Sequence, residues 1–152
     1  MFKQLILLCA LSMPLVSCAA TAPFSGEIST QALLSDYDKF NEQYKAFIPT
    51  EQDIALMQKL EGKELIVLFG TWCHDSEREV PKLIKLLGAA KVKLASIDYV
   101  AVGYNKRDDA GIAQAHDLQY TPTFIVKQNG KELVRVVEKP TDTLAQDLTK
   151  GL

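Results

Sequence analysis

The chain has 152 residues, of which 47% are hydrophobic, 24% charged and 8% aromatic. This length and composition are typical of one globular domain, and the chain is too apolar to be disordered. A formal net charge of −2 without a basic run gives no support to nucleic-acid binding. Three cysteines and two histidines leave no repeated ligand set for a structural zinc ion, and we expect neither a metal nor a cofactor.

The first residues have the pattern of an export signal. Lys3 gives a positive charge, and residues 5–16 form an apolar run shorter than the about 20 residues that a membrane-spanning helix needs. Positions 15–18, Leu-Val-Ser-Cys, resemble the lipobox of bacterial lipoproteins, which implies cleavage before Cys18 and lipid attachment to this residue. Ordinary cleavage near Ala20 or Ala22 is the alternative.

This resemblance divides the first 29 residues into a signal peptide, residues 1–17, and a short tether, residues 18–29. A lipid on Cys18 would place the domain in the bacterial cell envelope, facing the periplasm. Ala19 stands where an aspartate would act as an inner-membrane retention signal, which favours the outer membrane in a diderm organism.

Residues 30–62 are predicted to form an N-terminal extension of two helices. Apolar residues recur every three or four positions from Leu33 to Phe47, which predicts one helix with a face toward the core. Thr50 and Asp53 resemble a capping box for a second helix, which Gly62 ends.

Residues 63–152 are predicted to alternate strands and helices around a central mixed sheet. The expected order is strand 65–69, helix 75–87 closed by Gly88, strand 92–98, helix 110–118, strands 123–127 and 132–137 joined at Asn129-Gly130, and a helix opened by Thr141. A β-α-β-α-β-β-α order behind two helices defines an α/β sandwich, in which the hairpin adds an antiparallel edge. Residues 106–109 are interpreted as a solvated loop.

The first strand-to-helix junction carries the residues Trp72-Cys73-His74-Asp75-Ser76. A cysteine at a helix N-terminus faces unpaired N–H groups and the positive end of the dipole, which stabilise the thiolate that attacks disulfides. Trp72 would shield the sulfur and offer an apolar surface to a partner. His74, if protonated, would favour the thiolate, whereas Asp75 would oppose it. A purely structural buried cysteine is the alternative interpretation.

Three features together resemble the thioredoxin superfamily over residues 63–150: the Trp-Cys-x-x-Ser motif, Pro81 eight residues after Cys73, and Thr121-Pro122 before a later strand. Within the superfamily the chain resembles bacterial thioredoxin-like thiol–disulfide proteins, several of which are membrane-tethered. The resemblance implies a thioredoxin-like fold and a cis-proline loop at Thr121-Pro122 that faces Cys73. The backbone before Pro122 would then pair with an extended substrate segment.

The sequence departs from this superfamily at the second cysteine, which is Ser76 here. A serine can donate a hydrogen bond to the Cys73 thiolate, but it cannot resolve a mixed disulfide, so an external thiol is needed. Val67 stands where many thioredoxins bury an acidic residue. Both departures indicate that the chain is not an ordinary dithiol reductase.

Three functions stay open at this point. The first is monothiol exchange at Cys73 with protein disulfides or with low-molecular-weight thiols such as glutathione. The second is a redox-silent module that binds envelope proteins in the groove around Trp72 and Pro122. The third, peroxide reduction as in peroxiredoxins, is disfavoured because that family places its threonine further upstream of the cysteine than Thr71. We expect the domain to be a monomer.

Overall fold

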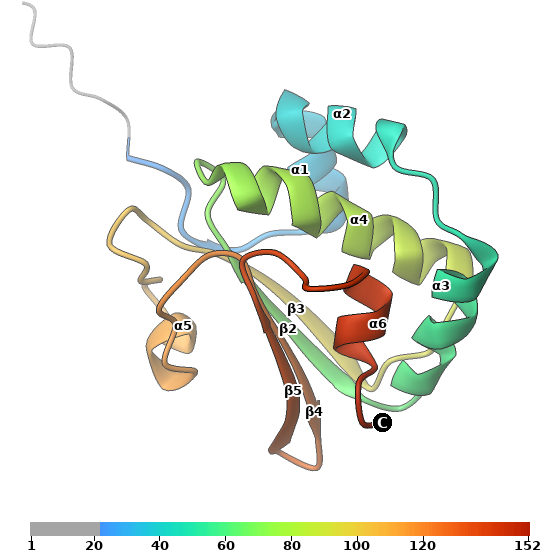
Figure 1. The fold of residues 1–152 in the computed structure, drawn as a ribbon. Coiled ribbons are helices and arrows are strands. Elements are labelled where there is room, and N and C mark those ends of the chain that lie inside the picture. The colour runs from blue at the N-terminus through green and yellow to red at the C-terminus, as the bar shows by residue number, and fades with distance from the viewer. Residues whose placement is uncertain (1–21) are drawn as a thin grey trace, which may run out of the picture.

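A computed structural model describes residues 22–152, which form one five-stranded sheet with helices on both faces (Figure 1). The strands are β1 Gly26–Glu27, β2 Glu64–Phe69, β3 Ser96–Ala101, β4 Thr123–Gln128 and β5 Lys131–Val137. Their order in the sheet is β1-β3-β2-β4-β5. β2 and β3 are parallel, and the other neighbours are antiparallel. The predicted mixed sheet is confirmed.

Six α-helices are formed within the described residues. They are α1 Thr30–Asp36, α2 Asp38–Ala46, α3 Glu51–Met57 with a 3-10 turn at Gln58–Leu60, α4 His74–Ala90, α5 Ile112–Ala115 and α6 Leu144–Leu148. The order from β2 onward is β2-α4-β3-α5-β4-β5-α6, as the sequence predicted. In residues 22–152, each helix is too short or too polar to span a bilayer.

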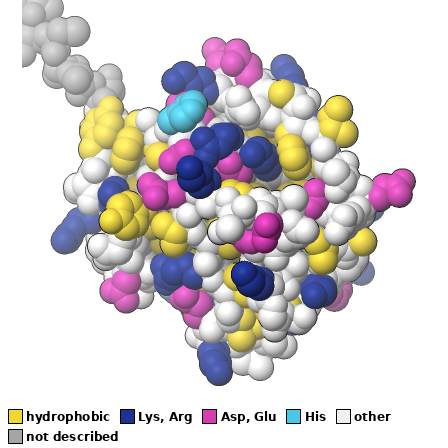
Figure 2. All heavy atoms as spheres, viewed as in Figure 1, with side chains coloured by type: hydrophobic (Ala, Val, Ile, Leu, Met, Phe, Trp, Pro, Cys, Tyr) yellow, Lys and Arg dark blue, Asp and Glu magenta, His cyan; other side chains and the backbone are white. Residues whose placement is uncertain are grey.

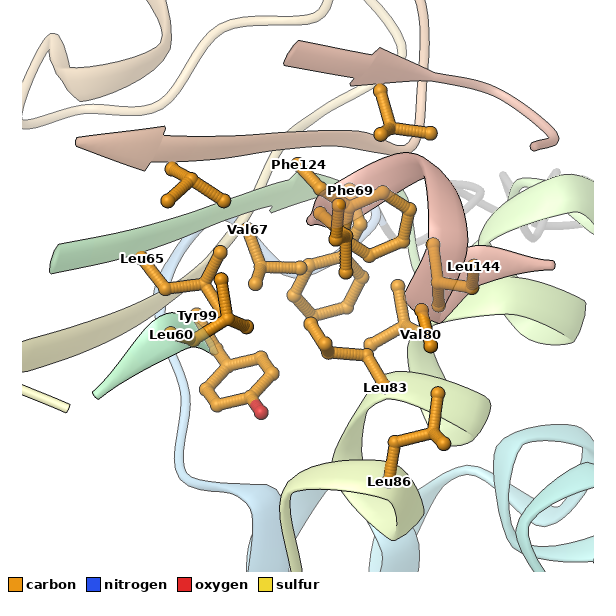
Figure 3. Packing of buried hydrophobic residues seen from close by; sticks show 14 of the residues in the cluster. Leu60, Leu65, Val67, Phe69, Val80, Leu83, Leu86, Tyr99, Phe124 and Leu144 are labelled. Carbon is orange, nitrogen blue, oxygen red and sulfur yellow. The ribbon is translucent and has the colours of Figure 1, made fainter. Parts of the chain in front are cut away.

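The hydrophobic core has two parts because side chains alternate across the sheet. From β2, Leu65, Val67 and Phe69 point toward the larger cluster, whereas Ile66 and Leu68 belong to the smaller one. Figure 3 shows side chains of the larger cluster from the sheet and from α4 meeting in one space. Helices α1 to α4 and α6 cover this face, and α5 covers the other. Burial on both faces explains the continuous apolar run of β2.

The N-terminal extension contains three helices, so the prediction of two was wrong. The expected single helix from Leu33 to Phe47 is interrupted at Tyr37, whose backbone is extended with φ −125° and ψ 95°. The break turns α2 so that Phe40 is fully buried, with its ring 5.9 Å from that of Phe69. The cap of the last helix in this segment was predicted correctly, since Thr50 accepts a hydrogen bond from the Asp53 N–H.

Two strands differ from their predicted positions. β3 begins at Ser96 rather than at Val92, because it pairs residue for residue with the six residues of β2. Gly26 and Glu27 lie in the predicted tether but form β1, which pairs with Ala101 and Val100. The prediction of a tether over residues 18–29 is therefore corrected for this part of the chain, and residues 1–21, with Cys18, lie outside the described residues.

Two helix boundaries also differ from the prediction. α4 continues through Gly88 and ends where Lys91 adopts a left-handed conformation with φ 51°. α6 is capped by Thr143 rather than by Thr141, in a complete capping box with Gln146. The predicted turn at Asn129-Gly130 is confirmed, since both residues have positive φ, 51° and 75°, as a tight hairpin turn requires.

The surface carries charges of both signs. Figure 2 shows Lys and Arg side chains interspersed with Asp and Glu side chains on the face that is viewed, with hydrophobic side chains scattered between them. On this face the electrostatic character is therefore mixed.

Candidate active site

Cys73 lies where β2 passes into α4, the longest helix of the described chain. It is the N-cap residue of α4, with φ −93° and ψ 122°, and its side chain makes no capping hydrogen bond. The Cys73 N–H donates to the Gly70 carbonyl at 3.1 Å, and the Glu77 N–H donates to the Cys73 carbonyl at 2.9 Å. The partly exposed sulfur is therefore held at the amide end of a 17-residue helix.

The segment opposite Cys73 is Thr121-Pro122, directly before β4. The peptide bond between these residues is cis, as the resemblance implied. The Cys73 thiol donates a hydrogen bond to the Thr121 carbonyl, with 3.1 Å between Sγ and O. On its other side this segment is fixed to the end of β5, because the Glu138 N–H donates to the Pro122 carbonyl at 2.7 Å. The structure thus brings together the two segments that the resemblance implied would face each other.

Ser76 does not have the predicted role of a hydrogen-bond donor to Cys73. Its side chain is fully buried, and its hydroxyl oxygen accepts a hydrogen bond from the Gly70 N–H at 3.2 Å. The sulfur of Cys73 is instead bonded to the Thr121 carbonyl. The prediction that Ser76 donates to Cys73 is therefore not what this structure shows: Ser76 fixes the loop between β2 and α4.

Trp72 packs beside the site and links it to the loop after β3. Its indole N–H donates to the Val102 carbonyl at 3.1 Å, and its ring lies 5.1 Å from that of Tyr104. Gly70 makes room for the indole, since a Cβ at this position would come within 2.7 Å of the Trp72 ring. Tyr104, which is 68% exposed, extends the aromatic surface outward.

The loop after β3 also reaches the segment before Pro122. Lys106 donates to the Gln119 carbonyl at 2.7 Å and lies 5.0 Å from the ring centre of the exposed Tyr120. Trp72, Tyr104, Lys106 and Tyr120 thus form what we call the aromatic band. The sequence analysis missed its last three members, because they are separated along the chain and carry no motif.

The interpretation of residues 106–109 as a solvated loop was also wrong for Asp108. This side chain is 3% exposed, and its two carboxylate oxygens accept hydrogen bonds from the Ile112 and Ala113 N–H groups. Asp108 therefore fixes the start of α5. The signal in the sequence that could have indicated this role was an acidic residue four positions before the first residue of a short helix.

Charged side chains surround the start of α4. His74 is 87% exposed, and its Nδ1 lies 3.7 Å from Oε2 of Glu77. Arg78 pairs with Asp75 at 2.7 Å and with the buried Glu79 at 2.6 Å. The hydrogen bond to Glu79 raises the pKa of Arg78, so this guanidinium stays charged.

The topology and the cis-proline segment opposite Cys73 define a thioredoxin-like fold, as the resemblance implied. A chain from a study of thiol resolution in yeast mitochondrial 1-Cys peroxiredoxin is similar at 21% identity and TM-score 0.39, covering 62% of this chain and 85% of the other. Mitochondrial thioredoxin 3 of Saccharomyces cerevisiae, in its oxidised form, is similar at 20% identity and TM-score 0.38. The match covers 62% of this chain and 86% of the other.

A protein of unknown function from Pseudomonas aeruginosa is similar at 17% identity and TM-score 0.48, covering 75% of this chain and 66% of the other. No protein-family model matches the chain, and no curated protein matches it. These likenesses concern the fold alone.

Proposed function

We propose that this protein carries out thiol–disulfide exchange through the single nucleophile Cys73, in the bacterial cell envelope. The observation that carries the proposal is the position of the sulfur: it belongs to the N-cap residue of a 17-residue helix and lies 3.1 Å from the Thr121 carbonyl oxygen before Pro122. The thiolate is the form that attacks a disulfide, and the amide end of a helix stabilises a negative charge.

The reaction is an exchange of sulfur bonds. The Cys73 thiolate bonds to one sulfur of a substrate disulfide, the substrate S–S bond breaks, and the other sulfur leaves with the electron pair and takes a proton from water. An external thiolate then attacks the substrate sulfur of the mixed disulfide and releases the Cys73 thiolate. The external thiol is needed because Cys73 is the one cysteine among residues 22–152.

The surroundings of Cys73 favour a polypeptide substrate. Within the described residues, the Thr121 N–H donates no hydrogen bond, and the residue itself is 4% exposed. In this proposal an extended chain reaches the backbone edge beside the exposed Tyr120 and pairs with it. The aromatic band offers apolar surface beside this backbone edge. A peptide that carries apolar residues around its disulfide would contact both features.

The proposed envelope location rests on the lipobox-like residues that end at Cys18. Gly26 is paired in the sheet, and Cys18 precedes it by eight residues. A chain of that length reaches at most about 28 Å. A lipid on Cys18 would therefore hold the domain close to the membrane surface.

A redox-silent binding module is the second candidate. It is favoured by the contact of the Cys73 sulfur with the Thr121 carbonyl at 3.1 Å, which engages the sulfur within the domain. In that case the same backbone edge and aromatic band would hold a partner without covalent exchange.

Alkylation of Cys73 by iodoacetamide between pH 5.5 and 9 separates the two candidates. Mass spectrometry of the peptide that contains Cys73 gives its rate, with N-acetylcysteine as the reference thiol and Cys73→Ser as the control. We expect Cys73 to react about three- to tenfold faster than the reference near pH 6, because the amide end of α4 stabilises the attacking anion. A profile equal to the reference would support the binding module.

A further inference from the structure

The N-terminal extension brings a positive charge to the start of α4. Lys39, on α2, lies with Nζ 3.3 Å from Oε1 of Glu77. The side chain of Glu77 is 10% exposed, whereas that of Lys39 is 73% exposed. Thus a nearly buried carboxylate is neutralised by a lysine from outside the β-α-β-α-β-β-α domain.

Glu77 is one helical turn from the proposed nucleophile. The Glu77 N–H donates to the Cys73 carbonyl at 2.9 Å, which is the i to i+4 relation of an α-helix. Glu77 therefore lies in the first turn of the helix that Cys73 begins, and its carboxylate places a negative charge at the amide end of this helix. A carboxylate in this turn opposes a negative charge on Cys73, and its poor exposure to water reduces the screening of this repulsion.

We propose that Lys39 is a positioning residue that keeps Cys73 reactive by offsetting the charge of Glu77. This inference rests on the proposed function of Cys73 as a nucleophile and names the part of the chain that regulates it. The negative charge of Glu77 acts against a negative charge on Cys73, and the ion pair with Lys39 offsets part of this effect. The helical extension, through α2, therefore sets the fraction of Cys73 that can attack a disulfide.

Other charged groups near the sulfur define what must be held constant. His74 lies 3.7 Å from Oε2 of Glu77, and its protonation would add to the effect of Lys39. Asp75 and Arg78 pair with each other. Two charged residues of other elements contact the segment around Pro122. Lys106 donates a hydrogen bond to the Gln119 carbonyl, and the Glu138 N–H donates to the Pro122 carbonyl. All of these stay unchanged in the variants below.

The test is the pH profile of Cys73 alkylation by iodoacetamide in Lys39→Met, Glu77→Gln and the double variant. We expect Lys39→Met to react roughly two- to fivefold more slowly than wild type near pH 6, the size of a partly exposed charge pair. The rates should converge at high pH, where every variant is fully thiolate. Glu77→Gln should react faster than wild type, and Lys39→Met should have little further effect in that background.

Two controls separate this electrostatic effect from a structural one. Lys39→Arg keeps the charge and should restore the wild-type profile, and Lys45→Met removes an exposed lysine at the other end of α2. Raising the salt concentration from 20 mM to 500 mM should reduce the difference between wild type and Lys39→Met.

The outcomes also distinguish the two proposals. If Lys39→Met and wild type share one profile, or if they differ equally at all pH values, the role of Lys39 is refuted. If wild-type Cys73 reacts like N-acetylcysteine, the proposed function fails. The comparison between wild type and Lys39→Met still decides the electrostatic coupling in that case.

Discussion

The Sγ atom of Cys73 lies 3.1 Å from the carbonyl oxygen of Thr121, although the two residues are 48 positions apart in the chain. The contact joins the start of α4 to the segment before β4. An attacking sulfur and a backbone edge for an extended partner are thereby placed next to each other.

Ser76→Cys should give the protein the ability to reduce disulfides by itself. The new thiol would stand three residues after Cys73 in the first turn of α4, where it can attack a mixed disulfide on Cys73. The measurement is the amount of insulin reduced in a single turnover by the reduced protein, after dithiothreitol has been removed. We expect a clear gain over wild type, and Ser76→Ala is the matched control without a thiol. An unchanged amount would mean that the groove around Cys73 does not accept a disulfide.

Gly70→Ala should disturb the site through Trp72. The added Cβ would lie 2.7 Å from the indole, which is also held by its hydrogen bond to Val102. Overpacking of this kind costs about 1–3 kcal/mol. Trp72 is the single tryptophan of the chain, so its fluorescence emission reports the displacement directly.

Gly88→Ala is the matched control for this substitution. Gly88 lies inside α4, and an added Cβ would meet no atom within 4 Å. Alanine favours a helix interior over glycine by about 0.5–1 kcal/mol, so this variant should be more stable than wild type. Unchanged emission and stability in Gly70→Ala would contradict the close packing of Trp72 on Gly70.

Asp53→Ala should destabilise the contact between α3 and α6. The Asp53 carboxylate is buried, and it accepts hydrogen bonds from the Thr50 hydroxyl at 2.8 Å and the Thr143 hydroxyl at 2.6 Å. Loss of a buried acceptor costs about 1–3 kcal/mol, which urea unfolding measures. In a double-mutant cycle with Thr143→Val, the double variant should lose less unfolding free energy than the two single variants lose together, because both substitutions remove the same hydrogen bond. Full additivity would show that the bond contributes nothing.

Acid should destabilise the fold through two groups near β5. Burial, with the charges of Lys127 and Arg135, lowers the pKa of His116 below 6.5, so stability falls as the unfolded chain takes up a proton near that pH. The hydrogen bond from Arg135 lowers the pKa of Glu132 below 4.5. Its stabilisation is present above about pH 4.5 and is lost as the pH falls through the folded-state value.

The urea midpoint between pH 7 and pH 3.5 measures this dependence. His116→Gln should abolish the loss between pH 7 and pH 5.5, and Glu132→Gln should reduce the loss below pH 4.5. Each effect should stay under about 1 kcal/mol, because water screens both partly exposed groups. A midpoint that rises toward acid pH would contradict the directions of both pKa shifts.

Most elements could be predicted where residues close together in the sequence determine the structure. The apolar run of β2, the helical spacing of α4 and the Asn129-Gly130 turn depend on neighbours in sequence. Predictions failed where the bounds of an element depend on contacts with residues far away in the sequence. β3 takes its length from β2, and Thr143 rather than Thr141 caps α6, where its hydroxyl also donates to Asp53.

The amino-acid sequence by itself determined the order of strands and helices from β2 onward and the position of Cys73 at a helix start, for which local periodicity and helix capping are sufficient. The facing position of Thr121-Pro122 was implied by the resemblance to the thioredoxin superfamily. The tertiary structure decided the role of Ser76, the aromatic band and the pairing of Lys39 with Glu77. Each depends on side chains brought together by the packing of separate elements. Contacts of this kind produce no periodic pattern in the sequence from which they could be predicted.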